Sequence, residues 1–483
     1  MKKTLLILFV IFATCHVCFG QQQTLKFNAN KKFKIVQFTD LHFDLRTDKY
    51  PQTLETMRQV LGKEQPDFII ITGDLVWAKP ARKALSLLTK PIIEANVPWT
   101  VTFGNHDVEF DITKEEAWKL FQSLPNFVGE IGCVTGVGNN VFPIYSSDGK
   151  NKPAAAIFTL DSHSDAENPI IFGSYDWMKY DQVEWFRQQS DKLASLNNQT
   201  PLPALMFFHI PLPEFHAVEA NETELVGDKF EGVADSHINS GLFASLIDKK
   251  NVMGIFVGHD HDNNYIGLHK DIALGFGQVT GADAYGQLER GGRVIELDEN
   301  HPKTFKTWIT TPNGKKHPFY YPSGLSEPDD NTEILPAQKV NPSKNGVRYT
   351  YFENSGKLKS TAEIAKLKKT SDGVMPNFEI TKQGDHFAYT FETWIKIPET
   401  GLYKFFTYSD DGSTLLIDGK IIVDNDGSHS ASYREARVGL EKGFHKLEVL
   451  YFEDYMGEEL QVGMLGIDIK RGKIPNEILF IEN

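Results

Sequence analysis

Residues 252–261 read VMGIFVGHDH, in which six apolar residues are followed at once by a glycine and by two histidines that lie two positions apart. A short, continuous apolar run is typical of a strand that is buried on both faces. In an extended backbone, residues i and i+2 point the same way, so His259 and His261 can face the same crevice. The stretch therefore predicts a buried strand that ends in a pair of imidazoles.

Similar apolar runs recur upstream of this strand and alternate with amphipathic segments. The other runs are residues 33–38, 68–72, 98–103, 154–160 and 204–208, and the helix-like segments include 50–64, 80–95 and 181–195. Continuous apolar strands separated by helical periods indicate buried strands that are covered by helices on both sides. This pattern predicts an α/β domain.

Five of the predicted strands end in polar residues that can bind metal ions. These residues are Asp40 and His42, then Asp74, then Asn105 with His106 and Asp107, then His209, and finally His259 with His261. Any one such motif alone is more often a cap or a surface group, whereas five at strand ends are hard to obtain by chance. Ligands of open α/β sheets bind outside the carboxyl ends of the strands, so these residues can converge on one crevice. A glycine precedes Asp74, Asn105 and His259, and we expect it to let the backbone turn sharply there.

These motifs also resemble a known family. The series Asp-x-His, Gly-Asp, Gly-Asn-His-Asp, His and Gly-His-x-His is similar, in that order, to the signature of calcineurin-like metallophosphoesterases, which include the purple acid phosphatases. The resemblance spans residues 31–300, and residues 263–296 look like the small branch of homologues that lacks an N-terminal sandwich. It implies a β-sandwich flanked by helices over residues 24–311.

The resemblance further implies a dinuclear metal centre that acts on phosphate esters. Asp40, His42, Asp74 and His261 would hold the first ion, Asn105, His209 and His259 would hold the second, and Asp74 would bridge them. A ligand set of nitrogen and oxygen without thiolate suits iron, manganese or zinc, as divalent or trivalent ions. Two such ions about 3.5–4 Å apart lower the pKa of a shared water, so the nucleophile would be a metal-bridging hydroxide, with no phosphoenzyme.

The resemblance also implies that two further residues of the Gly-Asn-His-Asp motif take part in catalysis. His106 would contact the phosphate and protonate or stabilise the leaving oxygen, and Asp107 would orient its imidazole. The alternative for Asp107 is a plain helix cap. One position departs from the purple acid phosphatases, which place a tyrosine three residues after the bridging aspartate, where this chain has Trp77. We therefore expect no tyrosinate charge-transfer colour.

The sequence pattern changes after residue 311. Residues 312–339 are rich in proline, glycine and serine, which predicts an extended linker. From residue 340 to 473, apolar residues alternate with polar ones between Asp-Gly turns, which predicts an antiparallel β-sandwich. Residues 408–419 and 423–427 resemble the sandwich module named after the protective antigen of a bacterial toxin. That resemblance implies a glycan or cell-surface ligand, and it implies calcium at Asp410 and Asp411, although the same residues also suit an ordinary turn.

The N-terminus is typical of an exported protein. Two lysines, a nine-residue apolar run and small residues before Gly20 predict a signal peptide over residues 1–20, cleaved near Gly20. The apolar run is too short for a membrane span. We therefore expect a secreted or periplasmic protein, in which Cys133 is the only remaining cysteine. The formal net charge of −14 disfavours nucleic acid as a partner.

The leading interpretation is an exported phosphomonoesterase with a C-terminal carbohydrate-binding module. A phosphodiesterase or nucleotidase on the same core is the first alternative, because the five motifs do not specify the leaving group. A non-catalytic, metal-containing glycan-binding protein is the second, although a structural metal site would not need His106. Loops 129–138, 162–179 and 213–237 are expected to set specificity, and their candidate residues are Tyr175, Trp177, His216 and His237.

Overall fold

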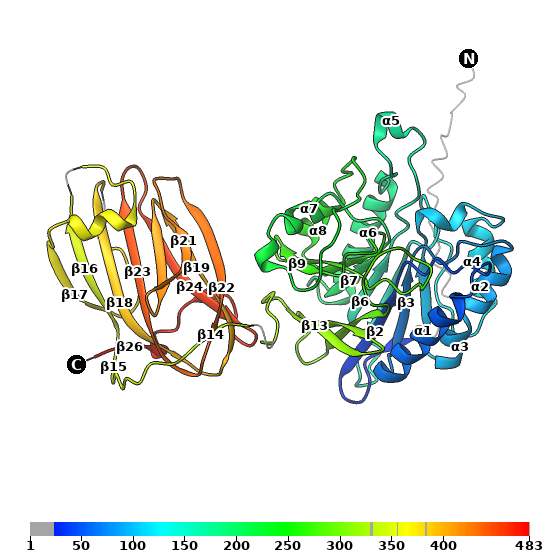
Figure 1. The fold of residues 1–483 in the computed structure, drawn as a ribbon, viewed down its shortest axis with the longest axis horizontal. Helices are drawn as coiled ribbons and strands as arrows, with labels where there is room; N and C mark the ends of the chain where they lie inside the picture. Colours follow the sequence, from blue (N-terminus) through cyan, green and yellow to red (C-terminus); the bar gives the residue numbers. More distant parts are fainter. Residues whose placement is uncertain (1–23, 329–331, 355, 382–383, 483) are drawn as a thin grey trace, which may run out of the picture. The chain divides into compact units, whose positions relative to one another are not determined.

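The computed structural model describes residues 24–328, 332–354, 356–381 and 384–482, and it divides into two compact units, Met1–His317 and Pro318–Asn483 (Figure 1). The predicted signal peptide, residues 1–20, lies outside the described residues. Within the described ranges, no helix combines the length and the apolar character that a membrane crossing requires.

The first unit contains two sheets. The six-stranded sheet has the order β13-β12-β11-β2-β3-β4, and the seven-stranded sheet has the order β1-β5-β6-β7-β8-β10-β9. Strands of the first sheet are β2 (Lys32–Phe38), β3 (Phe68–Thr72), β4 (Trp99–Thr102), β11 (Gly292–Asp298), β12 (Phe305–Thr311) and β13 (Gly314–Tyr321). Strands of the second are β1 (Leu25–Lys26), β5 (Asn140–Tyr145), β6 (Pro153–Thr159), β7 (Ala204–Phe207), β8 (Val252–Val257), β9 (Ile266–His269) and β10 (Ile272–Phe276). All six strands predicted from apolar runs form, and the predicted α/β class is confirmed.

Helices cover the outer face of each sheet (Figure 1). Beside the six-stranded sheet lie α1 (Tyr50–Glu64), α2 (Ala81–Leu88), α3 (Lys90–Ala95) and α4 (Lys114–Gln122). Beside the seven-stranded sheet lie α6 (Tyr180–Leu196), α7 (Phe215–Glu219) and α8 (Leu242–Lys249), while α5 (Pro169–Phe172) stands on a projecting loop. Strand β3 pairs in parallel with β2 and β4, and β7 pairs in parallel with β6 and β8, so the site-bearing ends lie at one edge within each sheet. Contacts such as the hydrogen bond from the His259 N–H to Asp40 Oδ1, at 3.0 Å, bring the two edges together.

The local sequence explains these elements. All five residues of β3, Phe68-Ile-Ile-Ile-Thr72, are buried, as expected for a strand with covered faces. In α1, Leu54, Met57 and Leu61 recur at helical spacing and are buried. The helix predicted over residues 80–95 is two helices, because Pro91, at the start of α3, has no N–H to continue the hydrogen bonds of α2.

Two buried polar side chains link the sheets close to the site. Gln37 on β2 donates from Nε2 to Thr72 Oγ1 at 2.8 Å and to the carbonyl of Val257 at 3.0 Å. Arg293 on β11 is fully buried and donates to the Phe276 carbonyl at 2.6 Å and to Thr307 Oγ1 at 3.1 Å. A shift of one sheet against the other would break these bonds and leave buried donors without partners, which would reduce the stability of the fold. The bonds therefore hold the strand ends of the two sheets in place.

The second unit is an antiparallel sandwich, which confirms the predicted class of the C-terminal domain. One sheet has the order β14-β22-β19-β24-β25, and the other contains β15-β26-β18-β23-β20-β21, with β16 paired to β18 and β17 paired to β16. The longer strands are β16 (Val347–Glu353), β18 (Phe387–Ile397), β19 (Gly401–Asp410), β22 (Ser432–Leu440), β23 (Gly443–Glu453) and β24 (Glu459–Gly466). The shorter ones are β14 (Ile334–Leu335), β15 (Lys344–Asn345), β17 (Ser371–Met375), β20 (Ser413–Ile417), β21 (Lys420–Asn425), β25 (Gly472–Lys473) and β26 (Leu479–Ile481).

The prediction that residues 312–339 form an extended linker is wrong for two segments. Residues 314–321 form β13, which pairs with β12 at the edge of the six-stranded sheet, so the boundary between the units, after His317, falls inside this strand. Residues 334–335 form β14, which pairs with β22 of the sandwich. The tripeptide Phe319-Tyr-Tyr321 provides the physical reason, since Phe319 is fully buried and gives β13 an apolar face. The sandwich also extends past residue 473, because β26 pairs with β18.

Candidate metal centre and active site

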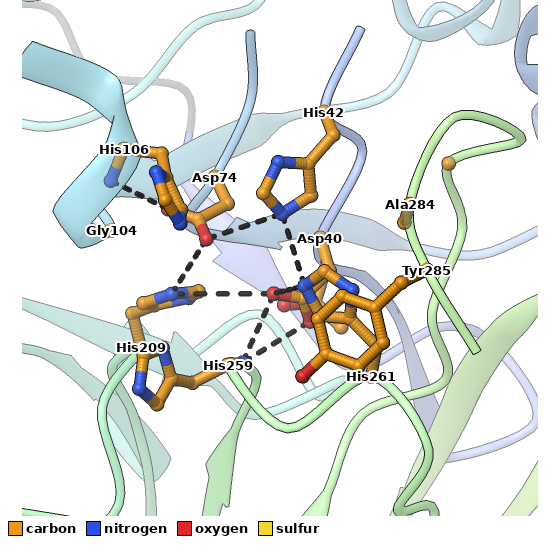
Figure 2. Close-up of polar contacts among 12 residues, drawn as sticks. Asp40, His42, Asp74, Gly104, His106, His209, His259, His261, Ala284 and Tyr285 are labelled. Carbon is orange, nitrogen blue, oxygen red and sulfur yellow. Dashed lines mark hydrogen bonds and ion pairs between the residues drawn. The ribbon is translucent and has the colours of Figure 1, made fainter. Parts of the chain in front are cut away.

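The polar residues that follow β2, β3, β7 and β8 meet in one buried cluster (Figure 2). Asp40, His42, Asp74 and His261 can each offer one ligand atom within 4.8 Å of the others, and so can Asp74, His209 and His259. Asp74 is the only residue that belongs to both groups, so the cluster has the form of two adjoining sites that share one carboxylate. Six of the seven predicted ligands are therefore brought together, in the predicted division.

The distances between these atoms fit ligands that surround metal ions. His42 Nε2 lies 3.0 Å from His261 Nε2 and 3.3 Å from Asp74 Oδ2, and His209 Nε2 lies 3.2 Å from the same Asp74 oxygen. With ligand bonds of about 2.0–2.2 Å, neighbouring ligand atoms around one ion are separated by about 3 Å. The two facing imidazole nitrogens, in particular, suit a shared cation better than a hydrogen bond between two bases.

Four buried polar atoms of the cluster have no hydrogen-bond partner. Three of them, Asn105 Oδ1, His209 Nε2 and His259 Nε2, belong to the predicted ligands of the second ion, while the fourth, His261 Nδ1, is on the other side of a ring whose Nε2 faces His42. Buried polar atoms are satisfied in the great majority of cases, so the first three orphans point to a common partner. Nδ1 of His209 lies 2.7 Å from the Thr72 carbonyl, which can only accept a hydrogen bond, so Nδ1 keeps its proton and Nε2 is the nitrogen that can bind a metal ion once it is deprotonated. The donor set fits two metal ions.

The backbone delivers these ligands through turns. Asp40, His42, Asp74 and His259 all have positive φ, of 53°, 39°, 51° and 79°. The predicted reason for convergence, an extended chain that points residues i and i+2 the same way, is therefore wrong. Strands β2 and β8 end at Phe38 and Val257, before the ligands begin. Instead, the positive φ angles turn the backbone sharply after each strand, and these turns direct the side chains to the site.

Glycines permit this folding in two different ways. Gly73 has φ +83°, which matches the predicted sharp turn. Gly104 and Gly258 serve close approach instead: a Cβ on Gly104 would lie 2.2 Å from Asp74 Oδ1, and one on Gly258 would lie 1.9 Å from Thr39 Oγ1. The loops that carry Asn105 and His259 can thus pack directly against the loops that carry the two aspartates.

The protonation states of the cluster favour metal binding. Burial lowers the pKa of His259 to about 3 and that of His261 to about 2, so both imidazoles are neutral. Burial alone would also lower the pKa of His209, but the carboxylates of Asp74 and Asp40 outweigh it and raise that pKa to about 9. Because a metal ligand must be deprotonated, an ion held by His209 would displace its proton at neutral pH.

His106 and Asp107 do not pair with each other. Asp107 is buried and accepts the backbone N–H groups of Asp74, Leu75 and Gly104 at 3.0, 2.7 and 2.8 Å. Its predicted role in orienting His106 is therefore wrong, and the capping alternative describes it. The carboxylate partner of His106 is Glu109, whose Oε1 lies 2.7 Å from Nδ1. Sequence reasoning missed Glu109, although its i+3 spacing from His106 was a usable signal.

Aromatic side chains pack on three of the ligand histidines. Trp77 lies 5.9 Å from His42, Tyr175 lies 4.4 Å from His259, and Tyr285 lies 4.0 Å from His261, as distances between ring centroids. Tyr175 is thus the one predicted specificity residue with such a contact. Of the others, Trp177 packs on Phe172, His216 bonds to Glu219 and Asp235, and His237 lies close to Gly173. Sequence reasoning did not identify Tyr285 as a site residue.

The second unit holds a smaller acidic cluster, formed by Asp410, Asp411 and Glu453. Asp411 accepts two backbone N–H groups at 2.8 Å, from His429 and Asp454, which is the behaviour of a turn-forming aspartate. Glu453 is fully buried, and its Oε1 has no partner. Burial and the two aspartates raise the pKa of Glu453 to about 8, so a cation at this position would relieve an unfavourable arrangement of carboxylates.

Comparison with known proteins agrees with this geometry. Residues 33–263 match the family model of calcineurin-like phosphoesterases, and residues 343–476 match that of the PA14 domain. Two relatives from Arabidopsis thaliana are named probable inactive purple acid phosphatase 29 and 14. The first is 33% identical and the alignment covers 60% of this chain and 85% of the relative; the second is 30% identical, with 62% and 83% covered. Phosphatase DCR2 of Saccharomyces cerevisiae is 30% identical, with 61% of this chain and 56% of that protein covered.

Each of the two family models matches one of the two folds. The helix-flanked sheets with their shared carboxylate match the first model, and the antiparallel sandwich matches the second. The first relative is aligned over most of its own length. This chain therefore belongs to the calcineurin-like metallophosphoesterases, in the group related to purple acid phosphatase homologues, and carries a C-terminal PA14 domain.

Proposed function

We propose that the protein is an exported dinuclear-metal phosphoesterase that hydrolyses phosphate monoesters. The observation that carries this proposal is the pair of buried ligand groups that share the carboxylate of Asp74, in which Nε2 of His209 and of His259 have no hydrogen-bond partner. When bound, two ions of iron, manganese or zinc would supply an activated water and polarise the phosphate oxygens. Export rests on the sequence of residues 1–20 alone.

The residues around the ligands support catalysis over a purely structural metal site. The backbone N–H of His106 donates to Asp74 Oδ1 at 3.0 Å, which fixes the histidine beside the shared carboxylate (Figure 2). Its Nδ1 is engaged by Glu109, and its side chain is 32% exposed, so Nε2 is left to meet a substrate. This imidazole can bind a phosphate oxygen and give a proton to the leaving alcohol. A structural site would need no such group.

The relatives named as inactive make a non-catalytic, metal-containing glycan-binding protein the alternative to exclude. The metal content of the purified chain is measured together with hydrolysis of p-nitrophenyl phosphate and of bis(p-nitrophenyl) phosphate. We expect two ions per chain and a kcat/KM for the monoester that exceeds that for the diester by at least about tenfold, or about 1.4 kcal/mol in the barrier. A higher kcat/KM for the diester would favour the phosphodiesterase or nucleotidase. Two bound ions without hydrolysis of either ester would contradict catalysis and favour the alternative.

We propose further that the PA14 domain binds calcium at Asp410, Asp411 and Glu453 and holds the enzyme on a glycan. An ion that binds only the folded state stabilises it, and calcium suits three carboxylates. We expect saturating calcium to raise the unfolding temperature of the full chain by about 5 °C, and Glu453→Gln to abolish this rise. Magnesium is the control ion. A shift of the same size in Glu453→Gln would contradict this site, and a glycan array probed in calcium and in chelator would test the ligand.

A further inference from the structure

Tyr285 forms a flat surface beside the metal centre. Its ring stacks on the His261 imidazole with an interplanar angle of 25° and a centroid distance of 4.0 Å (Figure 2). The side chain is nevertheless 58% exposed. One face of the phenol therefore covers a ligand histidine, while much of the remaining ring is open to solvent next to the place where a phosphate ester would react.

Hydrogen bonds hold the loop of Tyr285 in place. Arg290 donates from Nε to the Gly281 carbonyl at 2.8 Å and from Nη1 to that of Leu288 at 2.6 Å, so the loop wraps around one guanidinium. Asp262, the residue after His261, accepts the backbone N–H of Gln287 at 2.6 Å. The Tyr285 hydroxyl donates to Glu231 Oε2 at 3.0 Å. The ring is thus pre-organised, which reduces the entropy that a bound group would cost.

A second exposed ring stands at the other side of the same ligands. Trp77 is 42% exposed and lies 5.9 Å from both His42 and His106, as centroid distances. The His42 and His261 rings are 4.7 Å apart, so Trp77, His42, His261 and Tyr285 form a row of four rings. Both ends of this row present aromatic surface to solvent, where a planar group can stack.

The charges around these rings select the kind of group that can bind. Beside Tyr285, the carboxylates of Glu231 and Asp262 stand against one cation, Arg290, so negative charge is in excess there. At the other end, Arg46 donates to the Trp77 carbonyl and its charge is paired with Asp44. A substrate with a second phosphate or carboxylate would be repelled beside Tyr285. A neutral flat ring meets no such penalty and gains contact with aromatic carbon.

We propose that Tyr285, aided by Trp77, determines specificity by stacking the leaving group, and that the substrates are phosphate esters of an alcohol with a flat, uncharged ring. This inference rests on the proposed phosphoesterase function, because the site must hold the phosphate for the ring to reach Tyr285. Alkyl and sugar phosphates offer no planar face, so they would bind through the phosphate alone.

The test measures binding of two non-hydrolysable probes, phenylphosphonate and methylphosphonate, to the metal-loaded full chain by calorimetry. In the unaltered protein we expect phenylphosphonate to bind more tightly than methylphosphonate. In Tyr285→Ala its affinity should fall about 3- to 10-fold, the range for one aromatic contact, while that of methylphosphonate changes less than twofold. Tyr285→Phe keeps the ring and should retain most of the preference. Metal content is measured for each variant, so that loss of the ions is recognised.

The outcomes separate the two proposals. Equal changes for both probes in Tyr285→Ala, or no preference for phenylphosphonate in the unaltered protein, would overturn the stacking role and leave phosphoesterase function standing. Failure of both probes to bind the metal-loaded protein would overturn the proposed function and this inference together. If Tyr285→Ala does not fold, Tyr285→Leu and Trp77→Ala supply the same comparison. Tyr285→Leu removes the flat ring but keeps a hydrophobic side chain, and Trp77→Ala removes the ring at the other end of the row.

Discussion

Replacing Asp74 with alanine is expected to leave at most one metal ion per chain and to lower kcat by at least about 10³-fold, because two-ion sites contribute several kcal/mol to the reaction. Asp74 Oδ2 lies 3.3 Å from His42 Nε2 and 3.2 Å from His209 Nε2, so one carboxylate serves both ligand groups. Its loss would remove a ligand from each ion. Elemental analysis and steady-state hydrolysis of p-nitrophenyl phosphate would measure both effects.

Asp67, at the opposite end of β3, offers a matched control. It precedes β3, whereas Asp74 follows it, and its Oδ2 accepts the backbone N–H of Lys34 at 2.8 Å. Asp67→Ala should reduce stability, because that N–H loses its partner, but it should retain two ions and full turnover per folded chain. Two ions in Asp74→Ala would contradict the shared-ligand assignment.

The second large effect is expected for His106→Ala, which should keep both ions and lose about 10²- to 10⁴-fold in kcat, the usual contribution of a general acid. The substitution removes an imidazole that takes no part in either ligand group. Its backbone N–H, which contacts Asp74, is unchanged. The combination of full metal content and lost turnover would distinguish a catalytic residue from a ligand.

His301 provides the control for this substitution. It resembles His106 locally, since its Nδ1 lies 2.9 Å from the carboxylate of Asp298, three residues away. It lies in the turn between β11 and β12, and Asp298 pairs with Lys32 at the start of β2, the end opposite Asp40. His301→Ala should have unaltered kcat. Unaltered turnover in His106→Ala as well would remove the histidine from the mechanism.

The strands and the order of the ligands could be predicted because both depend on short stretches of sequence. The run Phe68-Ile-Ile-Ile-Thr72 is apolar at every position, which leaves a buried strand as the simplest interpretation. His259 and Asp74 each follow such a run after a single glycine. Polar residues at the carboxyl ends of buried strands are expected to converge on one crevice, so their proximity could be predicted although β3 and β8 belong to different sheets.

The side-chain partners could not be predicted in the same way. Asp107 and Glu109 both lie within three residues of His106, and sequence alone favoured the nearer carboxylate. The choice depends on three backbone N–H groups from neighbouring loops, which converge on Asp107 and leave Glu109 free to reach the imidazole. Likewise, Tyr285 becomes a site residue only through the long-range packing of its loop against His261.

The left-handed backbone of Asp40, His42, Asp74 and His259 has a consequence for protein design. Each non-glycine residue held in that region costs about 1–3 kcal/mol, which the surrounding fold must absorb. If the seven ligand residues were placed at ordinary strand ends of another scaffold, the amino acids would be present, but their side chains would not point toward a common site. Transfer of this centre to another protein would require its loops as complete units, including Gly104 and Gly258, which allow the loops to pack closely.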